Sequence, residues 1–153
     1  MGIASVIQNS AKADLLRAGT NFNTSGGTPA GHAFKIALYT DSTTIDTTTT
    51  AYGGPSNEVS GTGYSSGGEA LTNTGVGTTT VTSFTDFSDV SWTSASFTAR
   101  GCLIYNTTAI TGLTANRAVC SITFGGDKTV SSGTFTIQFP TNDSSSAIIR
   151  LTS

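Results

Sequence analysis

The chain has 153 residues, enough for one domain, and only 10% of them are charged, against roughly 25% in a typical globular domain. A net charge of −2 and scattered Lys and Arg residues exclude the basic face that nucleic-acid binding requires. No apolar run approaches the roughly 20 residues of a membrane-spanning helix, so no membrane partner is expected. The first residues lack the pattern of a secretory signal, which predicts synthesis in the cytoplasm.

The N-terminal segment is the one helical candidate. A helix is expected over residues 3–18 with Gly19 as its stop, or over 11–18 with Ser10 as its cap. Residues 20–33 are punctuated by Asn, Gly and Pro, which predicts a linker. The apolar face of the helix is expected either to dock on a neighbouring molecule or to close one end of its own domain. Its side chains are Ile3, Val6, Ile7, Leu15 and Leu16.

The remainder of the chain reads as β-structure. The sequence therefore divides into residues 1–33, an arm or helix with a Gly-rich linker, and residues 34–153, a β-sandwich domain. In the first strand, 34–40, Phe34, Ile36 and Leu38 alternate with the polar Lys35. Short strands between Gly-rich turns predict a mainly β fold, an antiparallel β-sandwich or jelly-roll-like domain. The further strands are expected at 57–64, 78–87, 89–92, 97–105, 117–124, 133–139 and 147–152.

Alternation within the later strands predicts which side chains share a face. The expected sets are Phe97, Ala99, Leu103 and Tyr105; Ala118, Cys120, Ile122 and Phe124; Phe135, Ile137 and Phe139; and Ile149 and Leu151. Cys102 and Cys120 lie in strands that could be neighbours, so a disulfide is one alternative. Buried free thiols are the other, and the one expected of a protein made in a reducing compartment.

Catalytic and metal-binding patterns do not emerge from the residues. The single histidine, His32, lies in the linker and has no triad partners in sequence, and the cysteines lack the spacing of zinc ligands. Gly61 to Gly67 departs from a dinucleotide fingerprint, because the third glycine comes one residue late and no helix follows. Asp86 and Asp89 are interpreted as solvated turn residues. We therefore expect no enzymatic activity, no cofactor and no bound metal.

Arg100 is the one charged side chain singled out as an interaction candidate. It lies in the middle of an expected strand whose apolar neighbours point to the opposite face. One interpretation is a surface guanidinium lying over the sheet. The other is an interface anchor, since arginine is enriched at binding hot spots.

An ordered set of segments resembles one protein family. Phe34 to Asp41 leads into a Thr-rich loop, Asn57-Glu58 and Gly63-Tyr64 follow, and a double glycine comes at Gly67-Gly68. Later segments are Ala99 to Gly101, Tyr105-Asn106, Phe124 to Asp127 and Phe135 to Pro140. Together they resemble a family of small virion structural proteins of tailed bacteriophages. The Gly/Pro-rich stretch 24–33 is longer than that pattern needs.

The resemblance implies a non-enzymatic virion protein, most simply a capsid decoration or cement protein that binds and stabilises the head shell. Its partners would be the major capsid protein or other virion proteins, and it would form a homo-oligomer. A tail or head–tail connector component is an alternative within the particle. A carbohydrate-binding β-sandwich module is a further alternative, in which Tyr39, Tyr52 and Tyr64 would cluster near one end of the fold.

Overall fold

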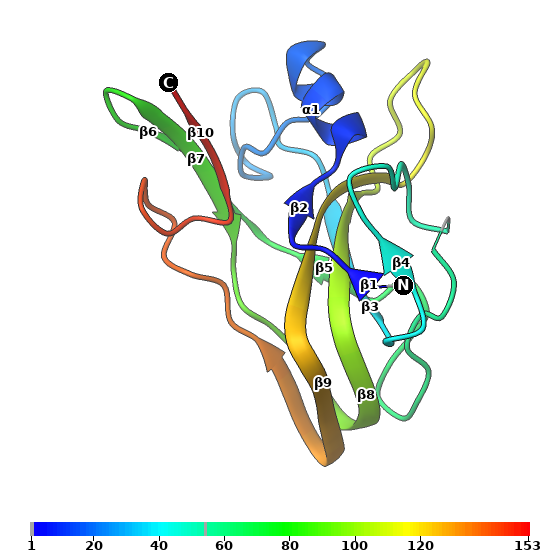
Figure 1. Ribbon diagram of the computed structural model, residues 1–153. Coiled ribbons are helices and arrows are strands. Elements are labelled where there is room, and N and C mark those ends of the chain that lie inside the picture. The colour runs from blue at the N-terminus through cyan, green and yellow to red at the C-terminus, as the bar shows by residue number, and fades with distance from the viewer. Residues whose placement is uncertain (1, 54) are drawn as a thin grey trace.

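The computed structural model describes residues 2–53 and 55–153, which fold into eleven short or long elements (Figure 1). In chain order these are β1 (Gly2–Ile3), β2 (Val6–Ile7), α1 (Asn9–Leu16), β3 (Phe34–Tyr39), β4 (Thr44–Ile45), β5 (Glu69–Leu71), β6 (Asn73–Thr78), β7 (Thr82–Phe87), β8 (Val90–Asn106), β9 (Arg117–Ile137) and β10 (Ile149–Thr152).

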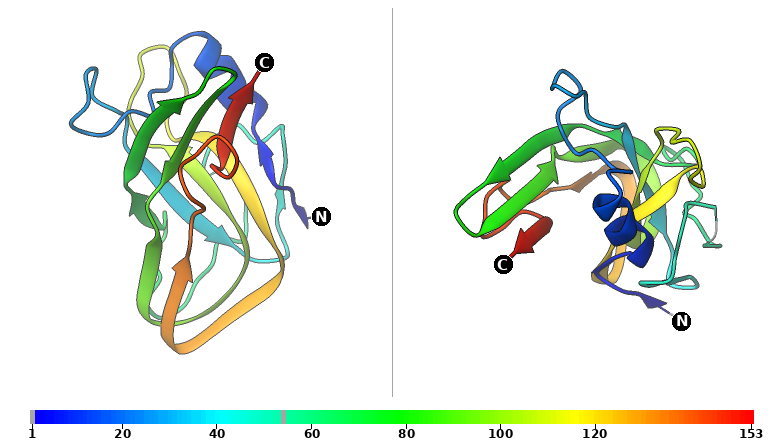
Figure 2. Two further views of the ribbon diagram at one scale, coloured as in Figure 1. Left: turned by 90° about the vertical axis from the view of Figure 1, so that its left-hand side faces the viewer. Right: turned by 90° about the horizontal axis from the view of Figure 1, so that it is seen from above.

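Two antiparallel sheets form the body of the fold. The larger sheet has the strand order β2-β9-β8-β3-β5 and the smaller one has the order β10-β7-β6. Only Thr72 separates β5 from β6, so the sheets are joined on that side, whereas β10 and β2 end them on the other. Seen from above, the fold is an open curve with its gap between β10 and the N-terminal elements (Figure 2). The expected mainly β, sandwich-like fold with a short N-terminal helix is confirmed.

Strand β3 is buried on both faces because the larger sheet carries a core on each side. Phe34, Ile36 and Leu38 face the main core between the sheets, as expected. Ala37 and Tyr39 face a second, smaller core. That core is covered by β1, which pairs in parallel with β4.

Strand β8 changes face at Arg100, so the prediction that its four apolar residues share one face is wrong. Phe97 and Ala99 face the main core, whereas Leu103 and Tyr105 face the second core. The pair Ala99–Lys128 is followed by the pair Gly101–Thr123, so the register shifts at Arg100, which lies opposite four residues of β9. This irregularity inverts the side-chain alternation of β8 beyond it.

A second irregularity separates Ala118 from the other members of its expected face. Cys120 belongs to the main core, as do the half-buried Ile122 and Phe124, but Ala118 lies in the second core. The register shifts here too, because Ile104 pairs with Cys120 while Tyr105 pairs with Ala118. Both cysteines are free and buried, so the free-thiol interpretation is confirmed. Burial raises the pKa of the Cys102 thiol to about 12.

The expectation of a helix over residues 3–18 is wrong for its first half. Ile3 lies in β1 and fills the second core, and Val6 and Ile7 form β2, which extends the larger sheet beside β9. Their i, i+4 spacing matches a helix, but β-branched side chains also suit a strand edge, and the free edge of β9 supplies the backbone partners. The N-terminal segment therefore packs on its own domain.

Helix α1 begins after Gln8, which makes no side-chain capping bond, so Ser10 lies inside the first turn rather than at the cap. The helix ends at Leu16, two residues earlier than expected. Ala18 adopts a positive φ of 56°, and Gly19 donates its amide to the carbonyl of Asp14 at 2.7 Å. This is the Schellman pattern, with alanine at the position that glycine usually takes.

The segment between α1 and β3 has no helix or strand, as expected, but it is attached to the core. Phe22 is buried and stacks on Phe34 with ring centroids 5.0 Å apart. The amide of Asn73 donates to the carbonyls of Asn23 and His32, which holds both ends of the loop. Phe22 is an aromatic residue inside an Asn- and Gly-rich stretch, and this is the feature of the sequence that indicates attachment of the loop to the core.

Several strand boundaries differ from the expected ones. Residues 57–64 form no strand, and their ladder pairing with the sheets is limited to single bridges at Glu58 and Thr62. The pairs of expected strands at 89–92 and 97–105, and at 117–124 and 133–139, each merge into one long strand. In β10, Ile149 is buried as expected, but Leu151 is 54% exposed.

Phe135→Ala tests the main core. Phe135 is half-buried, and its ring lies 5.2 Å from Phe97 and 5.9 Å from Trp92. Truncation should lower the free energy of unfolding by about 3 kcal/mol, the lower end for a buried phenylalanine, because the site is partly open. Urea denaturation measures it, with the exposed neighbour Thr134→Ala as the control. Equal stabilities of the two variants would show that Phe135 does not face the core.

Candidate functional site

Several residues of the segments 57–58, 63–64 and 67–68 gather around one carboxylate. Glu58 Oε1 accepts hydrogen bonds from the Tyr64 hydroxyl at 2.7 Å and the Gly67 amide at 2.6 Å. Oε2 accepts from the Tyr52 hydroxyl at 2.8 Å and from Ser66 Oγ at 3.0 Å. All four bonds join the loop before β5 to a single side chain. We call these residues the Glu58 cluster.

The Glu58 cluster also contacts the larger sheet. The Leu38 amide donates to the Tyr64 hydroxyl at 2.9 Å, and the Tyr105 hydroxyl donates to the Gly67 carbonyl at 2.8 Å. At Gly68, φ is +67° and a Cβ would lie 1.8 Å from the Ile36 carbonyl oxygen. Only glycine fits that close approach. The motif residues therefore have a structural role, attaching the loop to β3 and β8.

Burial and the nearby carboxylate act on every tyrosine of the chain. The pKa of Tyr64 and that of Tyr39 are raised, mainly by burial and further by the charge of Glu58. Burial first, and then Tyr52 and Glu58, raises the pKa of Tyr105 to about 12. The pKa of Tyr52 is also raised, mainly by burial. The expected clustering of Tyr39, Tyr52 and Tyr64 is thus found, together with Tyr105.

Arg100 lies at the bulge of β8, with its side chain about one-third exposed. Its guanidinium is 3.5 Å from a carboxylate oxygen of Asp41 and 3.4 Å from one of Asp127. The two acids come from the loop after β3 and from β9. The side chain thus lies over the sheet and links three segments at the surface, where such pairs add little stability. Its role as an interface anchor stays a prediction.

The other residues considered for chemistry have structural partners. His32 Nδ1 lies 2.9 Å from the Asn106 amide nitrogen. Asp86 is buried, not solvated as expected, and accepts from the Phe87 amide at 2.8 Å and the Ile148 amide at 3.1 Å. Within residues 2–53 and 55–153, no three His, Cys, Asp or Glu side chains are grouped to hold a metal ion. In the same part of the chain, no helix is long and apolar enough to cross a membrane.

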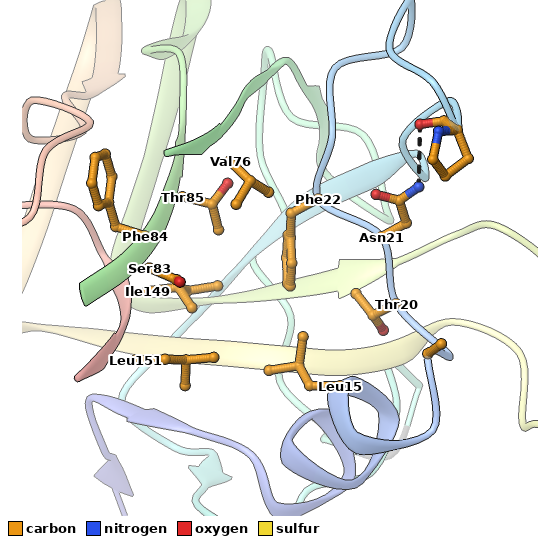
Figure 3. A pocket seen from close by; sticks show the side chains of 12 residues that line it. Leu15, Thr20, Asn21, Phe22, Val76, Ser83, Phe84, Thr85, Ile149 and Leu151 are labelled. Atoms are coloured by element: carbon orange, nitrogen blue, oxygen red, sulfur yellow. Dashed lines mark hydrogen bonds between the residues drawn. The ribbon is translucent and has the colours of Figure 1, made fainter. Parts of the chain in front are cut away.

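The best candidate for a binding surface is an apolar groove on the open side of the sandwich. A hollow of about 350 Å³ lies between α1 and the smaller sheet, where Leu15, Phe22 and Leu151 converge (Figure 3). A second hollow of about 290 Å³ lies along β2, and a third of about 560 Å³ lies over β9. Each reaches Ile148 or its neighbour Ile149. We call these three neighbouring hollows together the seam groove.

The seam groove exposes side chains that would be core residues in a closed sandwich. Ile122, Phe124, Phe135 and Ile137 pack against the main core on one side and line the groove on the other. No carboxylate lines it, and Lys128 is its single charged lining residue among those the structure describes. The groove can bind apolar groups, and it offers no acid–base pair for catalysis.

Three of the sequence-predicted interaction residues line the seam groove, namely Val6, Ile7 and Leu15. Ile3 does not, because it is buried in the second core. Leu16 lies outside the lining and is 92% exposed. The sequence did not reveal that β9 and β10 contribute to the groove. Apolar residues alternate along a strand in the same way whether its apolar face is covered by another element or left open.

Comparison with protein-family models, curated proteins and solved structures finds no match to this chain.

Glu58→Gln tests the Glu58 cluster. An amide in place of the carboxylate turns one acceptor atom into a donor, so at least one of the four donors loses its partner. Hydrogen bonds to charged groups contribute about 1.5–3 kcal/mol, and we expect the free energy of unfolding to fall by about 2 kcal/mol or more. The matched control is Glu69→Gln, at an exposed position of β5. A loss no larger than that of the control would contradict a stabilising role of Glu58.

The raised tyrosine pKa values predict weak stability in alkali. The folded state holds its phenol protons more tightly than the unfolded state, so this contribution is complete below the ordinary pKa of about 10 and is lost as the pH rises above it. Phenolate absorbance should show no tyrosine ionising near pH 10 in the folded protein, whereas all four ionise there in urea. A folded protein with an ordinary titration would refute the burial of these hydroxyls.

Proposed function

We propose that this chain is a non-enzymatic structural protein of a tailed-bacteriophage virion, acting as a decoration or cement protein on the head shell. The proposal begins from the resemblance of the ordered segments to that family. Some of those segments also lie together in the fold, since Glu58, Tyr64, Gly67, Gly68 and Tyr105 meet in one cluster. A set of motifs that builds one framework supports a shared fold better than scattered matches would.

The observation that carries the proposal is the seam groove. It is an exposed apolar surface on a rigid sandwich, and it has no catalytic groups along its lining. Exposed apolar patches of this kind mark protein-binding sites. Many copies would bind to a repeating shell, and multivalency raises the effective affinity. Each contact between this chain and the shell could therefore be weak. A shell-binding protein uses these properties directly.

A carbohydrate-binding role gains no support from the tyrosines. A sugar platform needs an exposed aromatic face, but the ring of Tyr52 stacks on Tyr105 with centroids 4.5 Å apart. The Tyr52 hydroxyl is committed to Glu58. Tyr64 packs between Trp92 and Phe97. The rings of Tyr52 and Tyr64 therefore pack against other aromatic residues of the fold and leave no open aromatic face for a sugar.

Quantitative mass spectrometry of purified virions of the phage that encodes the chain tests the proposal. The molar ratio of this chain to the major capsid protein is the measured quantity, with the capsid protein as internal standard. A copy number comparable with that of the capsid protein is expected of a decoration protein. A ratio of a few per cent would place it instead in the tail or connector. Its absence from purified particles would refute a virion role.

A further inference from the structure

The sandwich lacks a strand on its open side. The larger sheet ends at β2 and the smaller one ends at β10. A gap separates β10 from the N-terminal elements (Figure 2), and hollows of the seam groove are lined by residues from both sides. On the opposite side the sheets are joined through Thr72. The main core is therefore enclosed on three sides only.

Strand β10 presents an unpaired edge to this gap. It pairs with β7 in the antiparallel register Ile149–Thr85 and Leu151–Ser83, and the Ser153 amide donates to the Val81 carbonyl at 3.1 Å. In an antiparallel ladder the residues between hydrogen-bonded pairs direct their backbone groups to the other edge. Arg150 and Thr152 thus offer amide and carbonyl groups on the free side, and no other described strand lies there.

An exposed apolar side chain accompanies this free edge. Leu151 of β10 is 54% exposed and lines the hollow beside Leu15 (Figure 3), and the hollow continues over the face of the smaller sheet to Val76 of β6, which is 56% exposed. A pleated strand places alternate side chains on one face, so a strand added to β10 would bury its apolar residues here. An amphipathic helix fits the site less well, because it would leave the backbone groups of Arg150 and Thr152 unused.

The charge of the groove restricts the occupant further. Lys128 is the single charged lining residue of the described chain, and no carboxylate faces it within the groove. An acidic residue at one end of an incoming segment would therefore find an opposite charge and no repulsion. The chemistry of the site matches an extended, apolar–polar alternating segment with an acidic end.

We propose that the seam groove binds an extended segment of another protein of the particle, which adds to β10 as a fourth strand and closes the sandwich. The inference deepens the proposed function and rests on it for the identity of the partner. Backbone hydrogen bonds to Arg150 and Thr152 fix the segment, and alternate apolar side chains cover Leu151, Ile148 and Phe135. This is recognition by β-strand addition.

A synthetic peptide tests the inference on the purified full chain. The probe is acetyl-Asp-Val-Thr-Ile-Thr-Val-amide, and the control has the same composition in the order Asp-Thr-Thr-Ile-Val-Val, which abolishes the alternation. Titration followed by NMR should show binding of the first peptide only. The Arg150 and Thr152 amides should shift and exchange more slowly with solvent. No binding at about 1 mM peptide, or equal binding of both peptides, would overturn the inference.

Two matched substitutions separate the groove from a general apolar surface. Leu151→Ser should weaken peptide binding about tenfold or more, because it removes apolar area that the peptide covers. Val81→Ser should leave binding unchanged, since Val81 is 56% exposed but does not line the groove. Equal effects of the two substitutions would contradict the assignment of the site.

Thr152→Pro tests the backbone edge. It removes an amide that points away from β7, so the fold should persist by circular dichroism while peptide binding is lost. Unchanged binding would refute strand addition. Sedimentation of the chain alone identifies the competing occupant: a dimer that Thr152→Pro dissociates would show that a second copy fills the groove, and the inference would be wrong. None of these results depends on the copy number in virions, so failure here leaves the proposed function to its own test.

Discussion

Strands β8 and β9 hydrogen-bond to each other from the Val90–Ile137 pair to the Asn106–Arg117 pair, and the remaining elements are arranged around this hairpin. Strand β3 adds to one side of it and β2 to the other. Because of the register shifts at Arg100 and near Tyr105, the hairpin contributes side chains to the main core along most of its length, and to the second core near the end that is closed by the loop 107–116. Without those bulges, Leu103 and Tyr105 would point away from the core that β1 and β4 cover.

The fold class could be predicted from the sequence because it depends on the alternation of side chains within single strands, which is a local pattern. Alternating residues such as Phe34, Ile36 and Leu38 define a strand face wherever the strand pairs, and Gly-rich turns separate such runs. The bulges were not predictable in this way. Nothing in the alternation near Ala99 or Ala118 marks the extra residue, because a bulge is set by the partner strand and by what each face must cover.

The N-terminal residues illustrate a second limit of sequence reasoning. Ile3 and Ile7 are spaced for a helix, and their final structure is decided by β4 and β9, which lie far away in the chain. The candidate site likewise depends on residues that are distant in the chain. Val6, Ile7 and Leu15 were identified as apolar residues in need of a partner, but the groove itself arises from the open side of the sandwich. Which strand is missing from a sheet is a property of topology, and single residues do not encode it.

The long-range partners of the N-terminal segment also set the order of events during synthesis. Val6 pairs with Ser121, and the carboxylate of Asp14, buried beneath α1, forms its ion pair with Arg117. These residues leave the ribosome before their partners, which follow more than a hundred positions later. Until β9 emerges, Val6 and Ile7 lack the strand with which they pair, and Asp14 lacks Arg117. Contacts of such separation slow folding, and they leave the nascent chain exposed to aggregation or to chaperones for most of its translation.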